Sequence, residues 1–236
     1  MHAPKEIPSK SVYTMNGLMR LEDQYIDQAT PESQQAINEQ YSQFDNFLER
    51  TARGEMNYYH MTDIWLYQAL REFYNKGESA LIIGSTQPWY EAVMRTHGCE
   101  NIVVSEYGPR PFEFEHIKYV HPDDLEGQFD CAISISSYEH CGLGRYGDPL
   151  DPDGDLHAMR ELKNHVKPGG ILFLAVPIGQ DTLVWNAHRI YGVHRLPRLF
   201  EGWKMAASVG FHPEQLNIYR GIDGSYQPIW VLRNED

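Results

Sequence analysis

The chain is poor in cysteine and has no long hydrophobic run. Its 236 residues include three cysteines, Cys99, Cys131 and Cys141, without a Cys-x-x-Cys pair. An odd count without paired spacing excludes a disulfide framework and a sulfur zinc site, and predicts reduced thiols in a cytoplasmic protein. No apolar run approaches the roughly 18 residues that span a bilayer, and the first ten residues lack the apolar core of a signal peptide. We therefore expect no membrane partner.

Positive charge is also scarce. Lysine and arginine total 20 against 33 acidic residues, which gives a net charge of −13. Nucleic-acid binding needs clustered basic residues to neutralise phosphates, so the composition predicts no nucleic-acid partner. A hydrophobic content of 42% is ample for a packed core. The length suits one domain with an appendage.

One stretch, residues 79–106, organises the rest of the chain. An apolar run over 80–83 ends at Gly84-Ser85, a helical pattern over 88–97 starts with Pro88, and a second apolar run over 101–105 stops at Glu106. Proline suits the first position of a helix. A strand, tight turn, helix, strand and terminal acid form the first half of a nucleotide-binding fold.

The following segments continue this α/β alternation. We expect helices over 155–166 and 197–209, a turn over 167–170, and strands over 117–120, 129–135, 171–176, 215–220 and 228–233. The last two strands form a hairpin. The predicted fold is α/β, a Rossmann-like doubly wound sheet of seven mostly parallel strands with an antiparallel closing strand.

The first 76 residues are expected to form a separate N-terminal arm and helical cap, and residues 77–236 the Rossmann-like domain. Residues 1–30 are polar and predict an irregular arm. A helix begins at Pro31, and a second follows an N-cap at Thr62 and ends near residue 75. Tyr58 and Tyr59, in the link between them, are expected to pack between cap and core.

Three pieces of the chain resemble the class I S-adenosylmethionine-dependent methyltransferases. They are LIIGS with Glu106 downstream, FDCAISISSYEH, and LKNHVKPGGILFLAVP. The resemblance covers roughly residues 77–233 and implies the fold, the cofactor S-adenosylmethionine and methyl transfer. More narrowly, SSYEHCGLGRYGDPLDPDGD and LVWNAHRIYG resemble an uncharacterised family named after nematode proteins of unknown function. The superfamily's first motif is glycine-rich, whereas this chain keeps one of its glycines, Gly84.

The resemblance implies a set of cofactor-binding residues. Gly84 supplies a permissive backbone at the turn, the Ser85 hydroxyl binds the methionine part, and Glu106 binds both ribose hydroxyls. Asp123 and Asp124 occupy the position that meets the adenine amine, although capping of the next turn explains them equally well. Ser136 and Tyr138 follow the fourth strand, at the edge where open α/β sheets bind ligands.

The catalytic candidates follow the fourth and fifth strands. His140, next to Glu139, is the first candidate for a general base, because a neutral imidazole accepts a proton near pH 7. His188 is the second candidate, and His194 with Arg195 the third. Three aromatic residues offer faces for a sugar or aromatic acceptor, although core packing explains Trp203 better: Trp185, Tyr191 and Trp203.

The acidic loop over residues 148–155 has two interpretations. Asp151, Asp153 and Asp155 copy the first ligands of a calcium loop, but Leu156 stands where that loop needs glycine, and the distal glutamate is missing. Helix capping is the plainer account. Magnesium held by this loop together with Glu139 and His140 is the alternative, and no metal is assigned.

The sequence thus predicts a methyltransferase that acts on a hydroxyl of a carbohydrate or other small polar acceptor. A nicotinamide oxidoreductase would need G-x-G-x-x-G, and a nucleic-acid amino-methyltransferase an N/D-P-P-Y/F where this chain has SSYE. The rival is a methyltransferase-like domain that has lost catalysis and serves as a binding or scaffold module. The acceptor, a small molecule or glycan, and the oligomeric state, monomer or homodimer, are left open.

Overall fold

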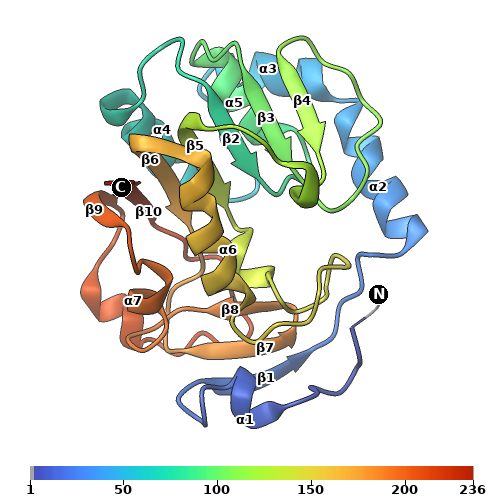
Figure 1. Ribbon diagram of the computed structural model, residues 1–236, viewed down its shortest axis with the longest axis vertical. Helices are drawn as coiled ribbons and strands as arrows, with labels where there is room; N and C mark the ends of the chain where they lie inside the picture. The colour runs from blue at the N-terminus through green and yellow to red at the C-terminus, as the bar shows by residue number, and fades with distance from the viewer. Residues whose placement is uncertain (1–2, 236) are drawn as a thin grey trace.

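The computed structural model describes residues 3–235, and a seven-stranded mixed sheet forms their centre (Figure 1). The strand order is β4-β3-β2-β5-β6-β10-β9. The first five of these strands are parallel, β10 is antiparallel to β6, and β9 is antiparallel to β10. This arrangement confirms the predicted fold class. The strands are β2 (Ala80–Ile83), β3 (Ile102–Ser105), β4 (Ile117–Val120), β5 (Phe129–Ile135), β6 (Val166–Ala175), β9 (Lys204–Val209) and β10 (Ile229–Arg233).

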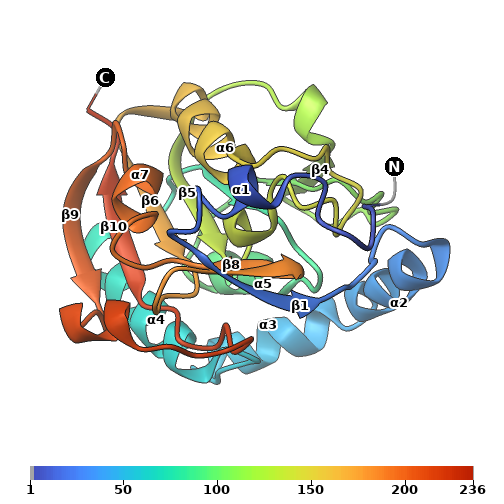
Figure 2. The same cartoon turned by 90° about the horizontal axis from the view of Figure 1, so that it is seen from below.

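Side chains alternate between the two faces of this sheet because successive residues of a strand point to opposite sides. Ile82 and Phe173 pack on one face, whereas Leu81 and Leu172 pack on the other. Both faces are covered by helices (Figures 1 and 2). The first face carries α3 (Phe44–Ala52), α4 (His60–Phe73) and α5 (Trp89–Thr96), and the second carries α6 (Gly154–Leu162) and α7 (Leu196–Leu199).

A second sheet of three strands lies beyond the carboxyl ends of the parallel strands (Figure 1). Its order is β1-β7-β8, made of β1 (Arg20–Gln24), β7 (Thr182–Asn186) and β8 (His188–Ile190). β1 pairs in parallel with β7, from Arg20 opposite Thr182 to Gln24 opposite Asn186. The prediction of an irregular arm over residues 1–30 is therefore wrong for this strand and for α1 (Lys10–Tyr13), while residues 1 and 2 lie outside the described part.

The N-terminal helices differ from the prediction at their boundaries. α2 (Pro31–Tyr41) begins where expected, and Thr30 caps it by accepting a hydrogen bond from the Ser33 N–H at 3.2 Å. α4 starts at His60, so Thr62 is inside the helix and not its N-cap. The Thr62 hydroxyl donates instead to the carbonyl of Gln227 at 2.8 Å. The N-terminal helices are thereby hydrogen-bonded to the loop before β10.

The C-terminal segment corrects two predictions. Residues 197–209 do not form one helix, since α7 ends at Leu199 and 204–209 form the edge strand β9. Residues 215–220 are not a strand, because a 3₁₀ helix, η4 (Pro213–Asn217), occupies much of the segment. Lys204–Val209 contains good helix formers, but pairing with the buried strand β10 overrides this local preference. The antiparallel closing hairpin is real, and β9 supplies its first strand.

Three short 3₁₀ helices follow strands β4 and β5 and helix α6. They are η1 (Pro122–Asp124), η2 (Tyr138–His140) and η3 (Lys163–His165). The predicted turn over 167–170 is absorbed into β6, where the register with β5 shifts between the Phe129 and Cys131 pairs. Within residues 3–235, no helix has the length and apolarity required to cross a bilayer.

Candidate active site

A cavity of about 1080 Å³ lies at the carboxyl edge of the parallel strands, and residues of both sheets line it. Such an edge is where open α/β folds bind ligands, and the volume suits a nucleotide-sized ligand together with a second small molecule. We divide the lining into two sides. The turn side comprises Gly84, Ser85, Glu106 and Asp123, and the histidine side comprises Tyr58, Tyr59, Ser136, Glu139, His140, Arg145, Tyr146, His188 and Gln227.

Gly84 adopts a conformation and a contact that exclude a side chain. Its φ of +73° lies in the left-handed region that favours glycine. A Cβ atom at this position would be 2.3 Å from the Ser137 hydroxyl oxygen, which follows β5. The single retained glycine of the turn therefore stands where the segments after β2 and β5 approach each other closely.

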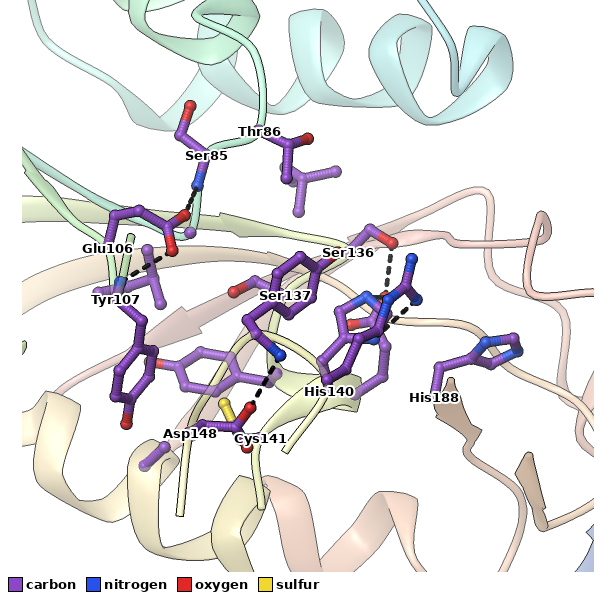
Figure 3. Close-up of a pocket in the computed structure, with 18 of the residues that line it drawn as sticks. Ser85, Thr86, Glu106, Tyr107, Ser136, Ser137, His140, Cys141, Asp148 and His188 are labelled. Carbon is purple, nitrogen blue, oxygen red and sulfur yellow. Dashed lines mark hydrogen bonds and ion pairs between the residues drawn. The ribbon is translucent and has the colours of Figure 1, made fainter. Parts of the chain in front are cut away.

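Glu106 ties the turn to the end of β3. One carboxylate oxygen accepts the Ser85 N–H at 2.8 Å, and the other accepts the Tyr107 N–H at 2.8 Å (Figure 3). Two longer contacts complete the set, the Gly108 N–H at 3.3 Å and the Arg110 guanidinium at 3.4 Å. The carboxylate is thus buried and held in place by the chain itself, at the position predicted for a ribose-binding acid.

The Ser85 side chain is turned away from its predicted role. Its hydroxyl donates to Glu91 Oε1 at 2.7 Å, so it is already engaged and not directed at the methionine part of a ligand. Burial raises the pKa of Glu91 to about 7. The Ser85 carbonyl accepts the Tyr41 hydroxyl and the Arg110 guanidinium, both at 3.0 Å. Helix α2 and the segment after β3 thereby fix the turn from two directions.

The two aspartates after β4 differ in placement. Both are exposed, but only Asp123 lines the cavity. Neither carboxylate caps η1, because the His121 side chain accepts the Asp123 N–H in that position. The structure therefore brings Asp123, and not Asp124, to the turn side.

Ser136 is the centre of a hydrogen-bonded cluster on the histidine side. Its hydroxyl lies 2.5 Å from Glu139 Oε1 and 2.9 Å from the Tyr59 hydroxyl, and Gln227 Nε2 donates to it at 3.1 Å. The expectation that Tyr58 and Tyr59 pack between cap and core is wrong for Tyr58, whereas Tyr59 joins the cap to the core through its bond to Ser136. Tyr58 is 79% exposed, and both tyrosines line the cavity.

Three buried acceptor atoms on the histidine side have no hydrogen-bond partner among residues 3–235. They are Glu139 Oε2, Gln227 Oε1 and His188 Nε2, which is an acceptor because the other ring nitrogen of His188 bonds to the Ile222 backbone. The orientation of Gln227 is fixed because its Nε2 also donates to the Gly224 carbonyl at 2.9 Å, which leaves Oε1 free. An unpartnered buried polar atom costs about 1–3 kcal/mol, so three in one cavity indicate a place that a polar ligand completes.

Glu139 and His140 form an adjacent acid and imidazole pair. Burial raises the pKa of Glu139 to about 7. His140 Nδ1 lies 2.6 Å from the Ala187 carbonyl, so this nitrogen carries the proton and Nε2 keeps its lone pair, 3.6 Å from Glu139 Oε1. Burial and the Arg145 charge hold the pKa of His140 well below its usual value. The imidazole is therefore a neutral hydrogen-bond acceptor at pH 7.

His188 lies across the same side, with its ring centre 6.3 Å from that of His140 (Figure 3). Burial lowers the pKa of His188 to about 4, so it too is neutral. The third candidates are not brought to the site. Arg195 binds the buried Asp155 carboxylate, and the N–H of His194 donates to Asp181.

The aromatic candidates lie in the core and not in the cavity lining. Trp185 is buried against Tyr13, with ring centres 5.1 Å apart. The Tyr191 hydroxyl donates to Asp155 at 2.8 Å, and Trp203 Nε1 donates to the Met159 carbonyl at 3.1 Å. Tyr138 is also fully buried, although its atoms contribute to the cavity wall.

The acidic loop has structural partners. Asp148 accepts the N–H groups of Gly142 and Gly144, Asp151 contacts His157, and Asp155 binds Arg195. Asp153 stands at the N-cap of α6 without a capping side-chain bond. In the described part of the chain, no group of three or more His, Cys, Asp or Glu side chains is arranged to hold a metal ion.

Sequence reasoning missed three residues that shape the histidine side, namely Tyr59, Arg145 and Gln227. Tyr59 and Gln227 belong to segments far from β5 in sequence and meet Ser136 only through the fold. Arg145 stands in SSYEHCGLGRYGD, directly after the predicted His140 loop. The positive charge of Arg145, close to acidic residues in the sequence, was the signal that could have marked it as a site residue.

The strand order and the position of the cavity define the fold of S-adenosylmethionine-dependent methyltransferases. The N-methyltransferase NodS from Bradyrhizobium japonicum WM9, in complex with S-adenosylhomocysteine, superposes with a TM-score of 0.52 at 15% identity, covering 84% of this chain and 99% of that chain. The 1,6-didemethyltoxoflavin-N1-methyltransferase from Burkholderia thailandensis, with bound 1,6-didemethyltoxoflavin and S-adenosylhomocysteine, gives 0.53 at 13% identity, covering 88% and 92%. At these identities the similarity establishes the fold.

The family is given by sequence. Residues 77–218, more than half of the chain, match the family described as "Caenorhabditis protein of unknown function, DUF268", and the chain belongs to that family. No curated protein matches the chain by sequence.

Proposed function

We propose that the protein is an S-adenosylmethionine-dependent O-methyltransferase that acts on a hydroxyl of a carbohydrate or other small polar acceptor. One observation carries the proposal. The turn at Gly84 and the Glu106 carboxylate line the same cavity as three unpartnered buried acceptor atoms. The fold supports the cofactor, because two proteins of this fold hold S-adenosylhomocysteine. Hydroxyl groups supply the donors that the acceptor atoms lack.

The turn side fits the cofactor. Gly84 keeps the backbone free of a side chain, and Glu106 holds its carboxylate at the end of β3. The two longer contacts of the Glu106 carboxylate, to Gly108 and Arg110, are the ones that two ribose hydroxyls would replace. When bound there, S-adenosylmethionine supplies a methyl group on a positively charged sulfur.

Glu139 takes the proton in this proposal in place of His140, the first candidate from the sequence, because the pKa of His140 is held well below its usual value. With the cofactor bound, the acceptor oxygen would bond to the methyl carbon as the carbon–sulfur bond breaks and its electron pair stays on sulfur. The hydroxyl proton would pass to Glu139, whose raised pKa of about 7 suits a general base at neutral pH. His140 Nε2 accepts a hydrogen bond and orients the hydroxyl. His188 Nε2 and Gln227 Oε1 accept from further hydroxyls and fix the acceptor's position.

An acceptor screen with methyl-labelled S-adenosylmethionine tests this proposal. The panel contains neutral and acidic sugars, oligosaccharides, phenols and small amines. We expect label on an oxygen of a polyhydroxylated compound, located by nuclear magnetic resonance of the product. Label that appears only on nitrogen, or on none of the compounds, would contradict the proposal.

A binding or scaffold module without catalysis is the second candidate. One observation favours it: the chain itself occupies the Glu106 carboxylate and the Ser85 hydroxyl. Isothermal titration calorimetry with S-adenosylmethionine and its demethylated product separates the two. Heat of binding for both ligands supports the enzyme, whereas heat for neither supports the module.

A further inference from the structure

Arg145 places a positive charge in the histidine side of the cavity. Its Nε donates to Gln28 Oε1 at 2.6 Å, and its Nη1 donates to the Ala187 carbonyl at 3.0 Å. The guanidinium carbon lies 5.1 Å from the centre of the Tyr146 ring. Two neighbours from distant segments and the adjacent Tyr146 therefore hold the side chain in one orientation, and all three are uncharged.

This arginine differs from Arg110 and Arg195 in having no acidic side chain in direct ion-pair contact, although its charge acts on Glu139 from a greater distance. Arg110 lies 3.4 Å from Glu106, and Arg195 lies 2.5 Å from Asp155. Within residues 3–235, no carboxylate oxygen lies within 4 Å of Arg145, and its Nη2 donates no hydrogen bond. A guanidinium offers five N–H donors in a planar fork that matches the oxygens of a carboxylate or phosphate. Two of these five donors bond to Gln28 and Ala187.

Its position is next to the proposed reacting groups. Arg145 Nη1 lies 3.4 Å from His140 Nδ1, and the His140 and Tyr146 rings are 5.4 Å apart. An anionic group on this guanidinium would therefore lie beside the Glu139–His140 pair. Because the protein carries a net charge of −13, a local positive charge in the cavity is also what an acidic ligand needs to enter.

We infer that the methyl acceptor is a hydroxylated acid, with its carboxylate or phosphate oxygens bound by Arg145 and its hydroxyls by Glu139, His188 and Gln227. The inference rests on the proposed function, because it assigns the acceptor of the same site. Arg145 supplies the charge selectivity, and the three acceptor atoms recognise the hydroxyl groups. A uronic acid or a sugar phosphate has both features, and a neutral sugar has only the second.

The test is calorimetric binding of four sugars to the full chain saturated with S-adenosylhomocysteine. Glucose, glucuronate, the methyl ester of glucuronic acid and glucose 6-phosphate share a ring and differ in charge. We expect the carboxylate, the phosphate or both to bind at least tenfold more tightly than glucose, with the ester close to glucose. The stronger of the two anions identifies the group. Equal affinity of all four, or no binding of any, overturns the inference.

Two variants of Arg145 assign the effect to this residue. Arg145→Gln is expected to remove the preference for the anion, and Arg145→Lys to retain part of it, with unchanged affinity for S-adenosylhomocysteine. Arg198→Gln, an exposed site outside the cavity, is the matched control. A loss of S-adenosylhomocysteine affinity in both Arg145 variants would assign the arginine to the cofactor and overturn the inference.

The same measurements separate this inference from the proposed function. Tight binding of the anion without methyl transfer to any acceptor overturns the proposed function and leaves the anion site intact. Methyl transfer to neutral sugars alone overturns the anion site and leaves the proposed function intact. Thermal unfolding of each variant shows whether the bonds to Gln28 and Ala187 are also needed for folding.

Discussion

The two sides of the cavity differ in how their polar groups are satisfied. On the turn side, the chain itself supplies donors to both oxygens of Glu106 and acceptors to the Ser85 hydroxyl. On the histidine side, Glu139, His188 and Gln227 each keep a buried atom without a partner in the described part of the chain. The turn side is therefore rigid before any ligand binds, whereas the histidine side is completed by one.

This difference has a physical consequence for substitutions. A change on the turn side removes bonds within the folded chain and lowers both stability and ligand affinity. A change that replaces an unpartnered atom on the histidine side breaks no hydrogen bond within the chain. It should therefore alter turnover or acceptor binding with little loss of stability. Four experiments test this contrast.

The largest expected effect is that of Glu139→Gln on turnover. Removal of the general base should lower kcat by a factor of about 10²–10⁴. Affinity for S-adenosylmethionine should stay within a few-fold, because Glu139 is on the histidine side. Steady-state kinetics and calorimetry measure the two quantities. The exposed Glu126→Gln is the control, and an unaltered kcat would remove Glu139 from the mechanism.

The Glu106→Gln variant should act on the other side. Its amide N–H₂ replaces an oxygen that accepts backbone N–H groups, so S-adenosylmethionine should bind less tightly by about 1–3 kcal/mol. The free energy of unfolding should also fall, because Arg110 loses its acidic partner. Calorimetry and urea unfolding provide the measurements. Unchanged cofactor affinity would mean that the ligand lies elsewhere.

Gly84→Ala compared with Gly54→Ala isolates the close approach at the turn. Both glycines have a φ near +70°, so each variant should lose about 1–2 kcal/mol from the left-handed backbone. Only the Cβ at residue 84 would also meet the Ser137 hydroxyl at 2.3 Å. Chemical unfolding should therefore show a greater loss for Gly84→Ala. Equal losses would show that the turn relaxes freely.

The pH dependence gives the smallest effect and has opposite signs for rate and stability. Because the pKa of Glu139 is raised to about 7, kcat/KM should rise with pH and level off above 7, with about a tenfold deficit at pH 6. Between 4.5 and about 7 the folded state retains a proton that the unfolded state has lost, so this residue's contribution to stability falls as pH rises. Both trends should disappear in Glu139→Gln, and a rate profile that is flat in the wild type would contradict the assignment.

The sequence predicted the parallel half of the fold closely because its signals are local. Strands 80–83, 117–120 and 129–135 have the predicted bounds, since mostly apolar segments there end at glycine or polar residues. Gly84 and Glu106 lie together for the same reason, because parallel strands bring their carboxyl ends to one edge. These features need no information from distant residues.

The missed features depend on contacts between distant residues. β1 has a polar sequence, RLEDQ, and forms only because β7, about 160 residues later, pairs with it. Tyr59 and Gln227 reach Ser136 from the cap and from the loop before β10. Helix propensity over 204–209 was overridden by an unpaired edge of the sheet. Local pattern therefore predicted the turn side better than the histidine side.

The most direct test of the account is a crystal structure of the protein with S-adenosylhomocysteine. We predict the ribose hydroxyls on the Glu106 carboxylate, the backbone of Gly84 against the ligand, and the sulfur directed toward the Ser136–His140 segment. A cavity that stays empty at saturating ligand, or a ligand bound away from Glu106, would contradict it.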